Sequence, residues 1–134
     1  MNSRPPVDWV ADLGGSVSIF AADGVANVLH GALNGISFRQ NVIADNIANV
    51  DTPDFRARSV DFESSLKDAV SRGGVGADGV DIDVAMTSTP VGVNGNNVDL
   101  RKEMLAATQT QFQYQLLTRA IAGKFASIKT AAGY

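Results

Sequence analysis

Cysteine is absent from the 134 residues of the chain. Its absence excludes disulfide bonds, a catalytic thiolate and zinc–thiolate sites together. Long apolar runs are absent too, because no window approaches the roughly 18 consecutive apolar residues of a membrane-spanning helix. The sequence therefore predicts a chain with no direct membrane span and no cysteine chemistry.

Positive charge is also scarce. The formal net charge is −3, the pI is about 4.9, and no basic run is longer than two residues. Such a chain lacks the electrostatic surface that nucleic-acid binding requires, so we expect no nucleic-acid partner. The N-terminal stretch up to Gly15 lacks the apolar core of a secretory signal peptide. If the chain is exported, we expect a route without signal cleavage.

Groups that carry enzyme chemistry are sparse. His30 is the only histidine, and we expect it to be a surface or packing residue. Asp78, Asp81 and Asp83 lack the glycine and the terminal bidentate acid of a calcium loop. No glycine-rich nucleotide-binding pattern occurs, and no serine has a neighbouring base. We therefore expect no enzyme activity, no catalytic residue, no cofactor and no metal site.

What the sequence does contain is a seven-residue repeat in its last third, from Asp99 to Ala132. Coiled coils keep such a period for more than four heptads, whereas helices of single globular domains rarely do. Asp99 is a suitable N-cap, and the helix would be roughly 50 Å long at 1.5 Å per residue. A helix of this length needs partner helices. Its main stripe is Leu100, Met104, Ala107, Gln111, Tyr114, Thr118, Ile121, Phe125, Ile128 and Ala132.

A second apolar stripe runs beside the main stripe of this helix. It consists of Leu105, Phe112, Leu116 and Ala120. A helix with two apolar faces fits an assembly of several helices better than an isolated dimer. We therefore predict that one stripe packs against a helix of the same chain and the other against neighbouring chains.

Residues 23–50 form a second helical candidate, with Asp23 as a plausible N-cap. Gly31 and Gly35 lie four residues apart on one face, where the missing side chains would let another backbone approach. The alternative is that glycine weakens this half by about 1 kcal/mol per residue, so that the firm helix begins only near Ile36. The apolar stripe of this helix is Leu29, Ile36, Ile43 and Val50.

The remaining segments are predicted to be less regular. Residues 1–22 carry two prolines and a Gly-Gly pair, which predicts an extended or disordered arm. The alternative is that Trp9 and Val10 anchor this arm on a partner. The predicted organisation is an arm over 1–22, a helical core over 23–53 and 99–134, and a connector over 54–98.

Within the connector, the spacing of apolar residues predicts a short helix from about Phe62 to Ser71. Val80, Ile82 and Val84 alternate with aspartates, a pattern typical of a short strand with one buried face. Glycine and asparagine punctuate the rest of the segment. The connector is therefore expected to be a short helix followed by a loop or hairpin, without a second core.

The end of the first helix carries a recognisable motif. In Asn41–Ala57, an Asn-Ile-Ala-Asn helix end is followed by Thr-Pro, an aromatic residue and a basic residue. This segment resembles the N-terminal signature of bacterial flagellar rod and hook proteins. Near the other end, Gly95–Leu100 and Glu103-Met104 are similar to the basal-body rod proteins of that family. The motif residues are Asn46, Ile47, Asn49, Thr52, Pro53 and Phe55.

The resemblance implies a mainly α fold, in which two long terminal helices pack as a coiled-coil-like bundle with an irregular or short β connector between them. It implies a structural subunit of the proximal basal-body rod that self-assembles into the axial drive shaft for motility. It also implies type III export without a cleaved signal peptide and a place in the periplasmic rod. The implied partners are copies of itself, other rod proteins, membrane-ring and rod-junction proteins of the basal body, and the flagellar export apparatus.

Two motif positions depart from the family pattern, and one other function remains open. Asp45 stands where the family often has asparagine. Asp54 stands where glycine or asparagine is common, and we expect it to disfavour a turn with positive φ. The alternative function is a generic coiled-coil adaptor or secretion chaperone that forms a small soluble oligomer. The residues expected at the helix-packing and assembly interface are Leu29, Ile36, Ile43, Ile47, Leu100, Met104, Tyr114, Leu117, Ile121, Phe125 and Ile128.

Overall fold

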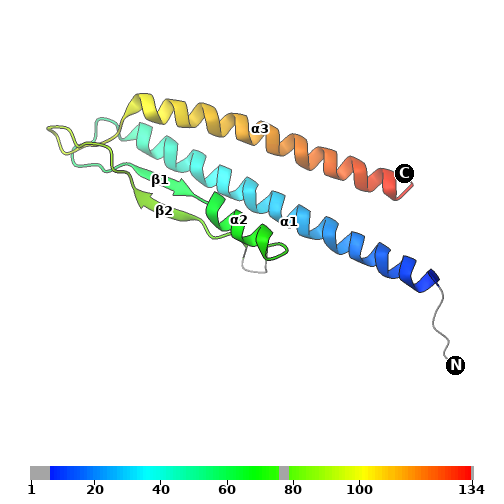
Figure 1. Cartoon of the computed structure of the whole chain (residues 1–134). Helices are drawn as coiled ribbons and strands as arrows, with labels where there is room; N and C mark the ends of the chain where they lie inside the picture. Colours follow the sequence, from blue (N-terminus) through cyan, green and yellow to red (C-terminus); the bar gives the residue numbers. More distant parts are fainter. Residues whose placement is uncertain (1–6, 76–78, 134) are drawn as a thin grey trace.

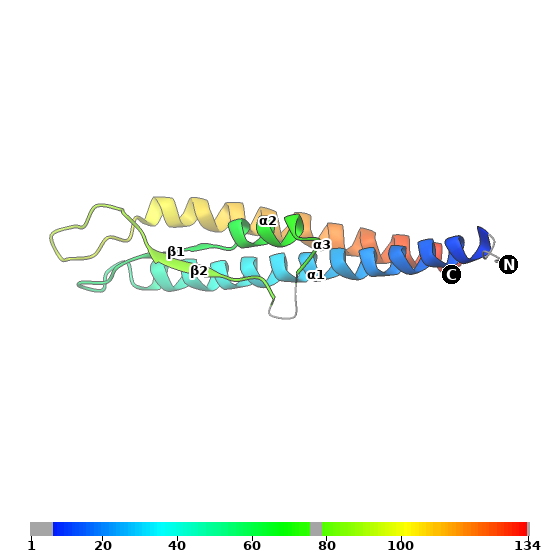
Figure 2. The ribbon, with the colours of Figure 1, turned by 60° about the horizontal axis from the view of Figure 1, so that its bottom comes forward.

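Two long helices dominate the computed structural model, which describes the backbone at residues 7–75 and 79–133 and the side chains from Gly24 onward. The elements are α1 (Val7–Ala48), β1 (Arg58–Asp61), α2 (Glu63–Ser71), β2 (Asp83–Met86) and α3 (Leu100–Ala131). The long helices α1 and α3 run side by side in opposite directions, so the start of α1 and the end of α3 lie at the same end of the molecule (Figures 1 and 2). The predicted mainly α fold with a short β connector is confirmed.

The first helix is much longer than the sequence predicts. It begins at Val7, so the expectation of an extended arm is wrong from that residue onward, and Asp23 lies inside the helix instead of capping it. Both prolines precede Val7, so neither breaks the helix. The Gly-Gly pair at 14–15 lowers helix propensity by about 1 kcal/mol per residue without interrupting the helix. Residues 1–6 lie outside the described residues.

Gly31 and Gly35 let the connector pack closely on α1. A β-carbon at Gly35 would collide with the ring of Phe62, and one at Gly31 would collide with Val80. The glycines therefore admit side chains, and not another backbone as the sequence suggested. The same face of α1 contributes to the hydrophobic core, in which half-buried side chains pack against buried ones. The core residues are Ala32, Ile36, Val42, Val60, Phe62, Leu66, Val80, Ile82 and Leu117.

The connector folds as a two-stranded antiparallel ribbon with one short helix. The strands β1 and β2 pair with Val60 opposite Val84, and β1 lies between β2 and α1 (Figure 1). The helix α2 matches the short helix predicted from Phe62 to Ser71. The strand expected around Val80–Val84 begins instead at Asp83, and all four residues of β2 are exposed. Sequence reasoning missed β1.

The last helix begins where the sequence predicts. The carboxylate of Asp99 accepts a hydrogen bond from the Lys102 backbone N–H at 3.2 Å, which satisfies one free amide of the first turn. Lys129 lies in the last turn, where a cation is favoured by the helix dipole. Within the described residues, no helix is long and apolar enough to cross a membrane.

Candidate assembly surface

The face of α3 that packs on α1 is not the predicted main stripe. Glu103 is 5% exposed, Thr110 is 2% exposed, and Leu117, seven residues further on, packs against the core. The predicted main stripe contains Met104, Gln111 and Thr118, each one residue later than these three. One residue turns a helix by about 100°, so this seam has the predicted seven-residue period, and these three stripe residues lie beside it.

This rotation leaves most large apolar side chains of α3 on the surface. Phe112 is 60% exposed, and both predicted stripes contain several exposed apolar residues. A monomeric protein seldom presents such a continuous apolar helix face without a use for it. The exposed set on α3 is Leu100, Met104, Leu105, Phe112, Tyr114, Leu116, Phe125 and Ile128.

The residues expected at the interface therefore divide into two groups. Inside the subunit, Ile36 and Ile43 are buried, and Leu29, Ile47, Leu117 and Ile121 are half-buried. On the surface of α3 lie Leu100, Met104, Tyr114, Phe125 and Ile128. Phe125 and Ile128 also border a small hollow whose α1 side includes Leu29. The subunit fold thus uses the first group and leaves the second available for contacts with other molecules.

The end of α1 is tied to the connector by buried amide side chains. Asn46 is fully buried; its amide donates to the Arg58 carbonyl at 2.8 Å, and its oxygen accepts from the Arg58 N–H at 3.1 Å. An amide side chain supplies both a donor and an acceptor, which matches the two free backbone groups of one strand residue. Asn46 therefore holds the edge of β1 that faces away from β2 against α1.

A second pair of asparagines closes the loops at this end. The Asn96 amide donates to the carbonyls of Asn49 at 2.8 Å and Thr52 at 2.7 Å. The Asn97 oxygen accepts from the Ala57 N–H at 2.6 Å, and the Asn97 N–H donates to the Phe55 carbonyl at 3.2 Å. The segment before α3 is thereby fastened to the segment after α1. We call Asn46, Asn49, Asn96 and Asn97 the asparagine clasp.

The turn inside the clasp corrects one expectation. Asp54 adopts a positive φ of 63°, although the sequence suggested that aspartate would disfavour it. Aspartate is among the residues that tolerate this left-handed region. Gly95 packs directly against Asp54, and a β-carbon there would collide with the aspartate side chain. The turn therefore needs glycine at 95, while Asp54 is tolerated.

Comparison with known proteins identifies the family. A family model described as flagella basal body rod protein matches residues 27–56. The flagellar basal body rod protein FlgB of Bacillus subtilis is 39% identical over 125 residues, covering 85% of this chain and 95% of that relative. The chain belongs to the flagellar basal body rod protein family. FlgB of Borreliella burgdorferi is 33% identical, with 74% and 88% covered, and FlgB of Escherichia coli is 33% identical, with 69% and 81% covered.

The predicted resemblance to flagellar rod proteins is thus confirmed, including the narrower resemblance to the basal-body rod proteins. The chain is a structural rod subunit, and the alternative of a closed adaptor or secretion chaperone is not favoured. The matched residues 27–56 span the second half of α1 and the first loop of the clasp. Asn46 and Asn49 of the rod-protein motif therefore serve the subunit fold.

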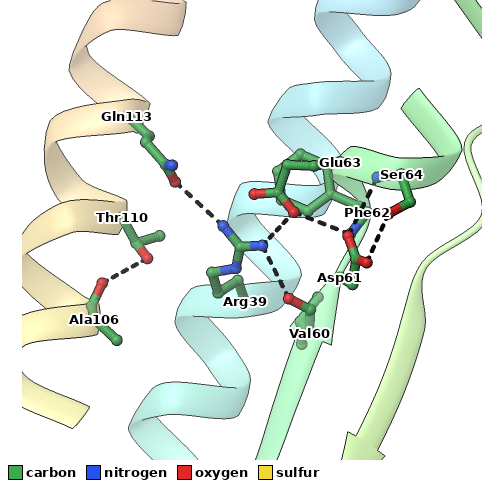
Figure 3. Close-up of polar contacts among 9 residues, drawn as sticks. All are labelled: Arg39, Val60, Asp61, Phe62, Glu63, Ser64, Ala106, Thr110 and Gln113. Atoms are coloured by element: carbon green, nitrogen blue, oxygen red, sulfur yellow. Dashed lines mark hydrogen bonds and ion pairs between the residues drawn. The ribbon is translucent and has the colours of Figure 1, made fainter. Parts of the chain in front are cut away.

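A polar cluster in this rod subunit connects α1, the connector and α3 (Figure 3). The Arg39 guanidinium donates to the Val60 carbonyl at 2.9 Å, to Glu63 at 2.6 Å and to Gln113 at 3.3 Å. It also lies 4.7 Å from the ring centre of Phe62, a cation–π geometry. Arg39 received no role from sequence reasoning, because its partners lie far away in the sequence.

At the start of α2, Asp61 accepts two hydrogen bonds from Ser64. The Ser64 N–H lies 3.2 Å from one carboxylate oxygen, and the Ser64 hydroxyl lies 2.9 Å from the other. The hydroxyl contact first, and then the N–H contact, lower the pKa of Asp61 below its ordinary value, because both favour the charged carboxylate. Asp61, one residue before the N-cap Phe62, thereby satisfies a free backbone amide in the first turn of α2.

Proposed function

We propose that this rod subunit polymerises by packing the exposed apolar stripes of α3 against neighbouring subunits. The observation that carries the proposal is the orientation of α3, which turns Glu103 and Thr110 toward α1 and leaves Phe112 and Leu116 outside. Such contacts join different surfaces of two copies, and contacts of this kind build open helical assemblies. The helices then serve as the wall of an axial rod.

The size of the apolar surface favours several neighbours over one. Full burial of a Leu or Phe side chain contributes about 1.5–3 kcal/mol, and these side chains are already partly covered, so each gains roughly half of that. Five of them contribute roughly 4–8 kcal/mol, against an association cost of about 4–15 kcal/mol. Burial of one stripe against one neighbour therefore barely offsets the association cost, whereas burial of both stripes against two neighbours offsets it.

The place and partners of the subunit follow from the same proposal. We place it in the periplasmic rod of the flagellar basal body, where it contacts copies of itself, other rod proteins, and ring and junction proteins. It reaches the rod through the flagellar export apparatus without a cleaved signal peptide. Its role is mechanical and not enzymatic, and support comes from the family and from the exposed stripes.

We call the exposed stripe of Leu105, Phe112, Leu116 and Ala120 the outer face of α3, and a charge placed on this face tests the proposal. Phe112→Asp replaces an aromatic side chain that is 60% exposed with a charged one, so the variant should stay monomeric in velocity sedimentation at concentrations where the parent chain assembles. It should also fail to restore motility to a strain that lacks the subunit. The free energy of unfolding should change by less than about 0.5 kcal/mol, as for other exposed positions.

Asn41→Asp is the matched control, because Asn41 is exposed on α1 and lies outside both stripes of α3. It adds the same charge and should assemble like the parent chain. Equal assembly of the Phe112→Asp variant would overturn the assignment of this face. A closed dimer or tetramer of the parent chain would instead support the adaptor function.

A further inference from the structure

An apolar hollow of about 440 Å³ lies between α1 and the end of α2. Val25, Val28, Leu29 and Val70 line it together with three glycines, and none of these described residues has a polar or charged side chain. Val25 and Val70 are exposed, so the hollow is open to solvent. Figure 1 shows α2 beside the middle of α1. We call this hollow the α1–α2 groove.

Glycine at position 24 leaves a space that the described part of the subunit does not fill. Gly35 of the same helix is needed because the ring of Phe62 occupies the space of its missing side chain. A β-carbon at Gly24 would instead meet the Gly73 carbonyl oxygen at 3.9 Å, which is an ordinary contact. Glycine inside a helix is less stable than alanine, and no described packing contact calls for it at this position. The space at Gly24 is therefore available to a side chain of another molecule.

The apolar surface continues from the groove onto the end of α3. Leu29 lines the groove and also the small hollow that it shares with Phe125 and Ile128. Phe125 and Ile128 are both exposed. An apolar surface that extends over several helices suits an amphipathic helix, which lays its apolar face into such a groove. We therefore expect the occupant to be a helix.

The outer face of α3 has the shape and the chemistry that the groove requires. Phe112 and Leu116 lie four residues apart, so their side chains form one ridge along the helix. From Met104 to Thr118 the helix carries no charged residue, although most of its side chains are exposed. Depletion of charge is typical of the buried centre of an interface. Neither the ridge nor the described lining of the groove contains a charged group that would have to lose its water.

We propose that Phe112 and Leu116 of one subunit insert into the α1–α2 groove of a second copy of the chain. The inference rests on the proposed polymerisation and names the surface that receives the outer face of α3. A ridge on α3 and a groove on α1 and α2 are different surfaces, so the contact is heterologous and leaves the groove of the first copy free for a third copy. Each copy thereby contacts two neighbours.

The positions of the ridge and the groove along the subunit predict a stagger between copies. Gln40 of α1 lies level with Phe112, because its side chain binds Gln111. Val28, in the groove, lies twelve residues before Gln40, which is roughly 18 Å along the helix axis at 1.5 Å per residue. Copies that point in the same direction are therefore offset by roughly 18 Å. An offset of this kind continues from copy to copy, as an open helical assembly requires.

A substitution that fills the groove tests the proposal. Gly24→Leu places a side chain in the groove and replaces glycine with a stronger helix former, so the dilute monomer should unfold at the same or a higher urea concentration than the parent chain. The concentration at which assembly begins should rise by at least about tenfold. Asn41→Leu adds the same side chain at an exposed position of α1 away from the groove, and its assembly should begin within about threefold of the parent concentration.

The outcomes separate this docking from the proposed function. If Gly24→Leu assembles like the parent chain and Phe112→Asp does not, the outer face of α3 is an interface that uses a different receiving surface, and this docking is overturned. If both variants assemble like the parent chain, the docking and the proposed function are both overturned.

Cross-linking locates the contact without changing the ridge or the groove lining, since the chain has no cysteine of its own. Copies with Gln109→Cys, three residues before Phe112, are mixed with copies of a different size that carry Ser71→Cys, next to Val70, and a short bismaleimide is added. The mixed product should exceed the product with Ser88→Cys, an exposed position near the asparagine clasp, by at least about tenfold, because docking raises the local concentration of one thiol at the other. Equal or greater reaction of Ser88→Cys in a chain that assembles would overturn this docking and keep the proposed function. A chain that stays monomeric at every concentration would overturn both.

Discussion

The helices α1 and α3 both carry a seven-residue apolar repeat, yet they use it in opposite ways. The repeat of α1 is buried, with Ile36 and Ile43 inside, because α1 packs against α3 on one side and against β1 and α2 on another. The helix α3 has only α1 as an extensive neighbour within the described chain, and most of its repeat is exposed. The difference indicates that α1 organises the subunit, whereas α3 is completed by other molecules.

Two phenylalanines give the strongest test of this comparison. Phe62 is 3% exposed and packs on Gly35 and Arg39 of α1, so Phe62→Ala should cost about 3–5 kcal/mol of unfolding free energy. Phe112→Ala makes the same chemical change on the outer face of α3 and should cost less than about 0.5 kcal/mol. Urea unfolding of dilute monomer, followed by circular dichroism, measures both.

In an assembly assay both variants should be impaired, but for different reasons. Phe112→Ala should weaken assembly of a subunit that is still folded, whereas Phe62→Ala should fail because the subunit itself unfolds. Equal losses of stability at the two positions would show that α3 is as well packed inside the monomer as α1. The comparison between the helices would then be wrong.

Sequence reasoning predicted the length, the start and the period of α3, because these depend on local features. Asp99 caps the helix, and no proline interrupts it. The face of α3 that meets α1 could not be predicted, because apolar spacing records burial in every context, including contacts with other molecules. Thr110 fits the seam because its hydroxyl donates to the Ala106 carbonyl at 2.7 Å, which removes the cost of burying it. Spacing alone does not reveal that bond.

The asparagine clasp shows a different limit. Asn46 and Asn49 were singled out only through the family resemblance, and Asn96 and Asn97 only as part of a similar stretch. Their partners lie between 8 and 47 residues away in the sequence, apart from turn contacts within the clasp. No local rule for helices or turns predicts such pairings. The available signal in the sequence was the presence of several asparagines on each side of the connector.

A substitution in the asparagine clasp should cause a loss of stability of intermediate size. Asn46→Ala leaves the N–H and the carbonyl of Arg58 buried without their partner, and it should cost about 2–4 kcal/mol. Asn41→Ala, at an exposed position of the same helix, should cost less than about 0.5 kcal/mol. Hydrogen exchange of the Arg58 amide should accelerate in the first variant alone. An unchanged exchange rate would mean that Asn46 does not hold the edge of β1.

The smallest expected effect lies at Asp61, an exposed residue at the end of β1. Because the contacts with Ser64 lower the pKa of Asp61 in the folded chain, they stabilise the fold above the unfolded pKa of about 3.8. This contribution is lost as the pH falls through the lowered folded pKa. The parent chain should therefore be slightly more stable than Asp61→Asn at pH 6, and the difference should shrink below pH 3.8. Asp51→Asn, on the exposed loop after α1, is the control for a change of net charge. A difference that grows as the pH falls would contradict the assigned contacts at the start of α2.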